Sequence, residues 1–141
     1  MSFQESDIAR LTTAFYTKVR VDDLIGPVFT ARIAQAEWER HISHIADFWS
    51  SVLLKTDRFS GNPMSKHLQI SEIEPRHFKR WLLLFQQTAH ETLEPDQAIE
   101  VLNTANRIAQ SLQMGLAFNY RKHGLEDHPF VDFEPKGLLR G

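Results

Sequence analysis

The sequence predicts an all-α fold, with about four long helices and one short, loop-tethered segment between the second and third. Apolar residues recur at helical spacing through most of the chain, and no stretch alternates as a strand would. Pro75 and Pro95 each precede such a stripe, and proline is well tolerated in the first turn of a helix. These observations favour helices packed on helices.

The first half of the chain carries two helical stripes. Ser2 and Glu5 are spaced as a capping box before a helix that we expect to end near Leu24, because Gly26-Pro27 opposes its continuation. The first stripe consists of Ile8, Leu11, Phe15 and Val19, and the second of Trp38, Ile42, Ile45, Trp49 and Val52.

The second half begins with a polar, turn-rich stretch over residues 55–63, which leaves room for only a short helix (MSKHLQI) before Pro75. Residues from Gly124 onward mix glycine, proline and charges. We therefore expect one domain over residues 1–124 and a loosely docked tail over 125–141. The two stripes of this half are Phe78, Trp81, Leu82, Phe85 and Ala89, then Ile99, Leu102, Ala105, Ala109, Leu112 and Leu116.

Composition narrows the function classes. The 141 residues are 42% hydrophobic and 24% charged, which is the balance of one ordinary globular domain. A net charge of −2 gives no reason to expect nucleic acid or an anionic membrane as a partner. The absence of cysteine excludes disulfides, thiolate metal sites and iron–sulfur clusters. The polar N-terminus is unlike a secretory signal, and the apolar run 81–85 is too short to span a bilayer, so we expect a cytoplasmic protein.

His67 is the first candidate for chemistry. Taken alone, a histidine in a short polar helix is most simply an exposed side chain. However, an irregular segment between two helices can also bring an imidazole to a metal, and neutral imidazole is a common ligand of iron. Leu68 could cover an apolar ring beside it, and Lys66 could reach a carboxylate at the edge of that ring.

Other candidates lie on the predicted helices. His41, Ile45 and Trp49 share one helical face, which suits either a satisfied interior histidine or a polar gate above two apolar walls. Tyr16 lies at the flank of its stripe and is either a half-buried tyrosine or a pocket residue. Trp81 is explained by core packing, although its indole N–H needs a partner if it is buried.

Four blocks of the sequence, in order, resemble the group III truncated haemoglobins. Residues 15–29 (FYTKVRVDDLIGPVF) are similar to the first block of that family, and residues 37–49 (EWERHISHIADFW) to its distal helix. Residues 61–68 (GNPMSKHL) resemble its proximal histidine segment, and residues 76–85 (RHFKRWLLLF) the helix whose tryptophan covers the distal pocket. The chain also lacks the paired-glycine motifs of the other truncated-haemoglobin groups. The tail after Gly124 falls outside the resemblance.

The resemblance implies a shortened globin fold, a two-over-two helical sandwich around haem b. It implies that His67 is the proximal iron ligand, that Tyr16 and Trp81 are distal hydrogen-bond donors, and that His41 gates the pocket or ligates the iron. The implied haem pocket is lined by Phe15, Phe29, Ile45, Trp49, Lys66 and Leu68.

The implied ligands are O2, NO and CO. Two buried donors would hold the partly negative outer atom of O2, and each such bond is worth roughly 1.5–3 kcal/mol. Slow O2 release suits O2 or NO chemistry or sensing better than bulk transport. NO dioxygenase or peroxidase-like activity, and an electron-donating reductase as partner, stay open.

Two other kinds of protein are alternatives to a haem protein. His41, His44 and His67 could hold zinc in a non-haem site, although HISH lacks the adjacent acid of a helical zinc-protease motif. The chain could also be a cofactor-free helical interaction module. That alternative leaves the polar segment around His67, which does no packing, without an explanation. A Soret absorption band would distinguish haem from both.

Overall fold

The structure, a computed structural model, describes residues 3–59, 61, 66–67, 73–124 and 127–132. Over these residues it is built from helices and turns without a strand, which confirms the all-α prediction. The helices are α1 (Glu5–Val21), α2 (Gly26–Thr30), α3 (Trp38–Leu54), α5 (Pro75–Thr92) and α6 (Pro95–Lys122), with 3-10 turns η1 (Gln35–Glu37) and η2 (Pro129–Asp132). None of the described helices combines the length and the hydropathy that crossing a membrane requires.

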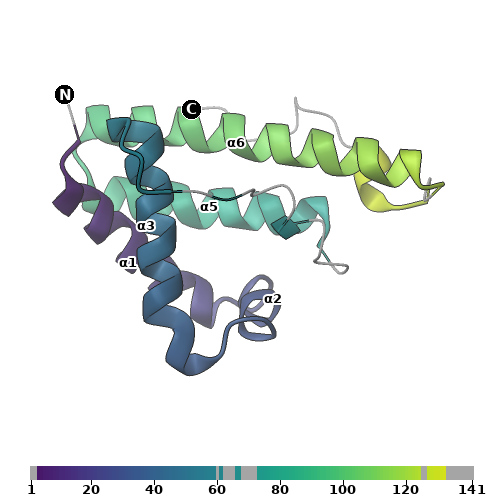
Figure 1. Ribbon diagram of the computed structural model, residues 1–141, viewed down its shortest axis with the longest axis horizontal. Coiled ribbons are helices and arrows are strands. Elements are labelled where there is room, and N and C mark those ends of the chain that lie inside the picture. Colours follow the sequence, from purple (N-terminus) through teal and green to yellow (C-terminus); the bar gives the residue numbers. More distant parts are fainter. Residues whose placement is uncertain (1–2, 60, 62–65, 68–72, 125–126, 133–141) are drawn as a thin grey trace.

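The long helices form two layers of two. Helices α5 and α6 run side by side, while α1 and α3 lie across them towards one end of the pair (Figure 1). Helix α1 packs on both α5 and α3, and it therefore joins the two layers. This arrangement is the predicted two-over-two sandwich.

The core consists mainly of the predicted stripes. Leu11, Val19 and Leu82 are fully buried, as expected from their phase on the helices. Ile99 is an exception, because its side chain is 58% exposed. It lies between the buried Ala98 and Val101, and the turn of the helix places it on the outer face.

The N-terminus of α1 differs from the prediction. Its capping box is formed by Gln4 and Asp7, in which the Asp7 carboxylate accepts the Gln4 backbone N–H at 2.9 Å. Glu5 is already the first residue of the helix, and Ser2 lies outside the described residues.

The C-terminus of α1 comes at Val21, earlier than expected, because Asp22 opens a turn there. Its carboxylate accepts the backbone N–H groups of Leu24 at 3.0 Å and Ile25 at 2.9 Å. The Gly26-Pro27 pair then begins α2. A Cβ at Gly26 would lie 3.0 Å from the carbonyl oxygen of Val19, so only glycine fits this close approach.

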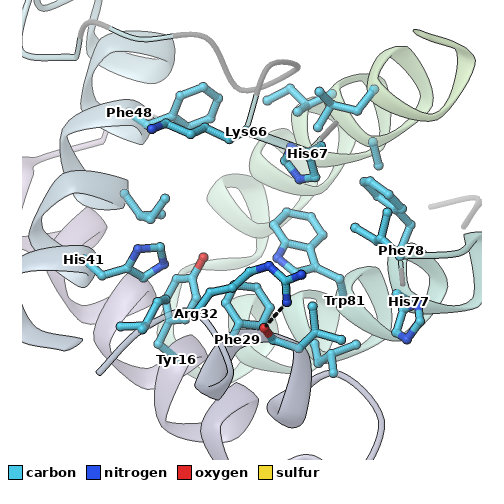
Figure 2. Close-up of a pocket in the computed structure, with 18 of the residues that line it drawn as sticks. Tyr16, Phe29, Arg32, His41, Phe48, Lys66, His67, His77, Phe78 and Trp81 are labelled. Atoms are coloured by element: carbon cyan, nitrogen blue, oxygen red, sulfur yellow. Dashed lines mark hydrogen bonds between the residues drawn. The ribbon is translucent and has the colours of Figure 1, made fainter. Parts of the chain in front are cut away.

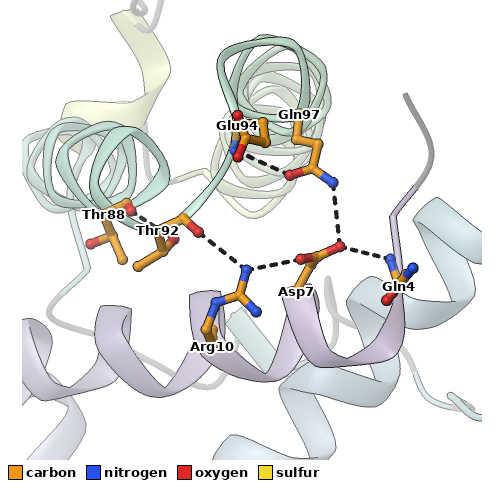
Figure 3. Close-up of polar contacts among 7 residues, drawn as sticks. All are labelled: Gln4, Asp7, Arg10, Thr88, Thr92, Glu94 and Gln97. Carbon is orange, nitrogen blue, oxygen red and sulfur yellow. Dashed lines mark hydrogen bonds and ion pairs between the residues drawn. The ribbon is translucent and has the colours of Figure 1, made fainter.

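A polar network joins three helix ends far from α2 (Figure 3). Asp7 accepts hydrogen bonds from Arg10 at 2.8 Å and from the Gln97 amide at 3.3 Å. Arg10 also donates to the carbonyl oxygen of Thr92 at 3.4 Å. Gln97 in turn accepts the Glu94 backbone N–H at 3.1 Å, so the start of α1 is tied to the end of α5 and the start of α6.

The described part of the predicted tail is packed rather than loose. Phe130 in η2 is fully buried and lies against Tyr120 of α6 and Phe78 of α5. A side chain buried to this extent belongs to the core, whereas residues 125–126 and 133–141 of the predicted tail lie outside the described residues.

Candidate ligand pocket

A cavity of about 500 Å³ lies between α3 and α5, bordered by α2 and the middle of α6 (Figure 2). This volume is within the range of small-molecule and cofactor sites. Most of its wall is apolar or aromatic. The wall includes Ile25, Val28, Phe29, Ile33, Ile45, Phe48, Trp49, Phe59, Ile73, Phe78, Ile108 and Leu112.

Tyr16 brings a hydroxyl group to the cavity from α1. The residue is only 3% exposed, and its ring is held edge-to-face by Phe15 at 4.9 Å and Phe29 at 5.8 Å between ring centres. Burial raises the pKa of Tyr16, and the nearby Trp81 indole N–H opposes part of this rise. The phenol therefore stays protonated and keeps its O–H donor.

Trp81 is fixed by the rings below it. Its indole is stacked on Phe85 at 5.0 Å with an interplanar angle of 6°, and it meets Phe15 edge-to-face at 5.4 Å. The preceding residue, Arg80, pairs with Asp22 at 2.8 Å. This ion pair fastens α5 to the end of α1, the helix that carries Tyr16.

His41 points into the cavity from α3 (Figure 2). Its ring packs edge-on against Tyr16 at 5.3 Å and Trp38 at 5.7 Å. Burial, followed by the nearby His44, lowers the pKa of His41, so the imidazole is neutral at pH 7. Its Nε2 atom is buried and has no hydrogen-bond partner among the described residues. Since an unsatisfied buried polar atom costs about 1–3 kcal/mol, this nitrogen indicates a place for a bound ligand.

His67 enters the cavity from the side opposite Tyr16 (Figure 2). Its ring is stacked on Phe78 of α5, with 5.6 Å between centres and an interplanar angle of 29°. An imidazole thus faces the cavity on each side, His67 from one and His41 from the other.

Two cationic side chains also border the cavity. Arg32 follows α2 and donates to the carbonyl oxygen of Val28 at 3.3 Å, and Lys66 precedes His67. Both are exposed, so their charges lie where the cavity meets solvent. They could bind carboxylates of a ligand that is otherwise apolar.

Most of the residues predicted from sequence line this one cavity. Phe15 does not line it, because it is 1% exposed and lies behind Tyr16 and Trp81 as their support. Leu68 lies outside the described residues. The predicted residues found at the cavity are Tyr16, Phe29, His41, Ile45, Trp49, Lys66, His67 and Trp81.

Several lining residues were not among the predicted site residues. Phe78 stands one helical turn before Trp81 on the same stripe, a signal that could have identified it. Arg32 and Phe59 lie outside any apolar stripe, so the sequence carries no comparable signal for them. His77 is buried at the edge of the cavity, where its Nδ1 atom accepts the Glu74 backbone N–H at 2.9 Å and caps α5.

The histidines do not form the zinc site considered above. Among the described residues, which include His41, His44 and His67, no three His, Cys, Asp or Glu side chains lie close enough together to hold a metal ion. His44 is exposed, and its ring contacts Phe59 at 5.0 Å at the edge of the cavity.

Comparison with known proteins places the chain among globins. The sequence profile of the bacterial-like globin family matches residues 4–113. Group 3 truncated hemoglobin ctb of Campylobacter jejuni is 31% identical over 124 residues, which cover 86% of this chain and 97% of that protein. The crystal structure of a group III truncated hemoglobin from Campylobacter jejuni matches with a TM-score of 0.75 at 32% identity, covering 79% of this chain and 92% of the other. This chain belongs to the bacterial-like globin family and, within it, to the group III truncated haemoglobins.

Proposed function

We propose that the chain binds haem b through His67 and holds diatomic ligands in a polar distal pocket made by Tyr16, Trp81 and His41. Membership of the globin family supports haem-based gas binding in general. One observation carries the finer proposal. Two imidazoles and a protonated phenol face one apolar cavity of about 500 Å³ from opposite sides.

The cavity suits a flat, apolar, dicarboxylate cofactor. Aromatic and aliphatic side chains form its walls, and Arg32 and Lys66 lie at its rim for the carboxylates. The Nε2 atom of His41, which has no hydrogen-bond partner among the described residues, is a further sign of a bound ligand. His67 is the residue proposed to hold the iron, with its ring supported by Phe78.

Haem, when bound, would supply an iron that the His67 imidazole could hold and that could bind small diatomic molecules. The chain supplies the hydrogen bonds. We expect the Trp81 indole N–H to donate to the Tyr16 oxygen, which leaves the single proton of the hydroxyl for the cavity. Such a donor, fixed in surroundings that exclude water, stabilises a partly negative ligand atom more than water does.

Slow ligand release follows from this arrangement, and it favours O2 or NO chemistry, or sensing, over bulk transport. Redox turnover would require electrons from outside the chain, so the proposed protein partner is an electron-donating reductase. The proposed small-molecule partners are O2, NO and CO.

The test is the absorption spectrum of the protein purified with haem supplied, then reduced, then exposed to CO. We expect a Soret band in the wild type and a changed or lost band in His67→Gly, with partial recovery when free imidazole is added. His44→Ala is the matched control, because this histidine lies at the exposed edge of the same cavity. A colourless wild type, or a His67→Gly variant with the wild-type spectrum, would contradict the proposal.

A further inference from the structure

We propose that the C-terminal turn η2 positions the proximal histidine, with Phe130 holding Phe78 against the ring of His67. This inference rests on the proposed role of His67 as the iron ligand. It assigns a positioning residue to the part of the chain that the sequence predicts as a loose tail.

A continuous line of aromatic rings supports the inference. The ring of His67 lies on Phe78 at 5.6 Å, and the edge of Phe78 meets Phe130 at 5.8 Å with an interplanar angle of 78°. Phe78 is 6% exposed and Phe130 is fully buried, so neither ring can turn without displacing its neighbour.

Phe130 is itself fixed from behind. Its ring is nearly parallel to Tyr120 of α6, with 6.2 Å between centres and an angle of 6°. His128 stacks on Tyr120 at 3.6 Å, and its Nδ1 atom accepts the Phe130 backbone N–H at 3.3 Å. The turn therefore rests on the last part of α6 and presents the Phe130 side chain towards Phe78, on the side of the cavity that carries His67.

Phe78 gives the ring of His67 a neighbour that is fixed on a long helix. Helix α5 fixes the backbone of Phe78, and Phe130 fills the space beside its ring. Phe130 lies beyond residues 4–113, the part that matches the globin family profile.

Removing the Phe130 ring should free Phe78 to rotate and allow the His67 imidazole to tilt. We expect Phe130→Leu to shift or broaden the iron–histidine stretching band of the reduced, ligand-free holoprotein in resonance Raman spectra. We also expect haem transfer to excess apomyoglobin to become about fivefold faster or more. In a Phe78→Leu background, Phe130→Leu should add less than about a twofold change, because the two residues act in series.

The control is Phe3→Leu, which removes another buried ring, 6% exposed, beside the N-terminus of α1 at the other end of the molecule (Figure 1). This variant should leave the iron–histidine Raman band unchanged and the haem-transfer rate within about twofold of the wild-type rate. Phe130→Leu keeps an apolar side chain, so it remains informative where Phe130→Ala fails to fold. An unchanged band and transfer rate in Phe130→Leu would refute the inference while the proposed function stands. A wild type without a Soret band would refute both.

Discussion

We expect Tyr16 and Trp81 to act in series, and a double-mutant cycle can test that order. In the proposed arrangement the indole N–H of Trp81 donates to the Tyr16 oxygen when a ligand is bound, and the hydroxyl keeps its own proton for that ligand. The informative changes are Tyr16→Phe, Trp81→Phe and the two together. Trp81→Phe removes the N–H and keeps an aromatic ring over Phe85.

The expected magnitudes follow from these roles. A hydrogen bond to a charged acceptor is worth about 1.5–3 kcal/mol. Since about 1.4 kcal/mol corresponds to a factor of ten, Tyr16→Phe should speed O2 release by about 10- to 150-fold. Trp81 strengthens the Tyr16 donor by cooperativity of about 10–30%, that is about 0.2–0.9 kcal/mol. Trp81→Phe alone should therefore speed release by only about 1.3- to 5-fold.

O2 dissociation can be followed by stopped flow, with CO trapping the reduced protein as O2 leaves. If the donors act in series, the double variant will resemble Tyr16→Phe alone to within about twofold. Thr17→Val is a suitable control, because it removes an exposed hydroxyl from the neighbouring position of α1. Two effects that multiply in the double variant would show independent donors and refute the reasoning.

Three further predictions concern stability. Burial opposes ionisation of Asp22, but the hydrogen bonds that its carboxylate accepts outweigh burial and lower its pKa. The stability that the ionised carboxylate contributes at pH 7 should therefore be lost as the pH falls below about 3.9. Asp22→Asn should cost about 1–2 kcal/mol at pH 7 in urea unfolding and much less at pH 3, with equal losses at both pH values counting against the assignment. His41→Leu should stabilise the apoprotein by about 1–2 kcal/mol in thermal melts, because it removes an unsatisfied nitrogen. It should also flatten the loss of apoprotein stability below about pH 6.5 that follows from the lowered pKa of His41; an unchanged pH profile would contradict this. Trp49→Ala should lower the free energy of unfolding by about 3–5 kcal/mol, since this 2% exposed ring stacks on Phe85 at 5.2 Å, and a loss below about 1 kcal/mol would disagree with that packing.

The sequence predicts helix starts well where proline marks them. Pro75 and Pro95 are the first residues of α5 and α6, because a missing N–H is harmless only in the first turn. The start of α1 is less well determined. Ser2–Glu5 and Gln4–Asp7 have the same spacing. Only the folded chain shows that Asp7 also accepts hydrogen bonds from Arg10 and from Gln97 of α6.

The pocket could be predicted only in part for a similar reason. Helical periodicity separates the inner face from the outer face, but α1 is covered on more than one side by α3 and α5. Both Phe15 and Tyr16 are therefore buried, and the spacing cannot tell which of the two faces the cavity. The packing of Phe130 depends on contacts with residues far away in the sequence, and nothing in the short segment around it indicates them.

The network of Asp7, Arg10, Thr92 and Gln97 has a consequence for how the chain folds before haem binds. None of these side chains borders the cavity, and the bonds join residues 82 and 90 positions apart in the chain. The end of the molecule where α1 meets the turn between α5 and α6 can therefore close without any help from haem. A newly made chain would therefore keep the helices packed at this end of the molecule while the cavity at the opposite side is still empty and able to bind haem.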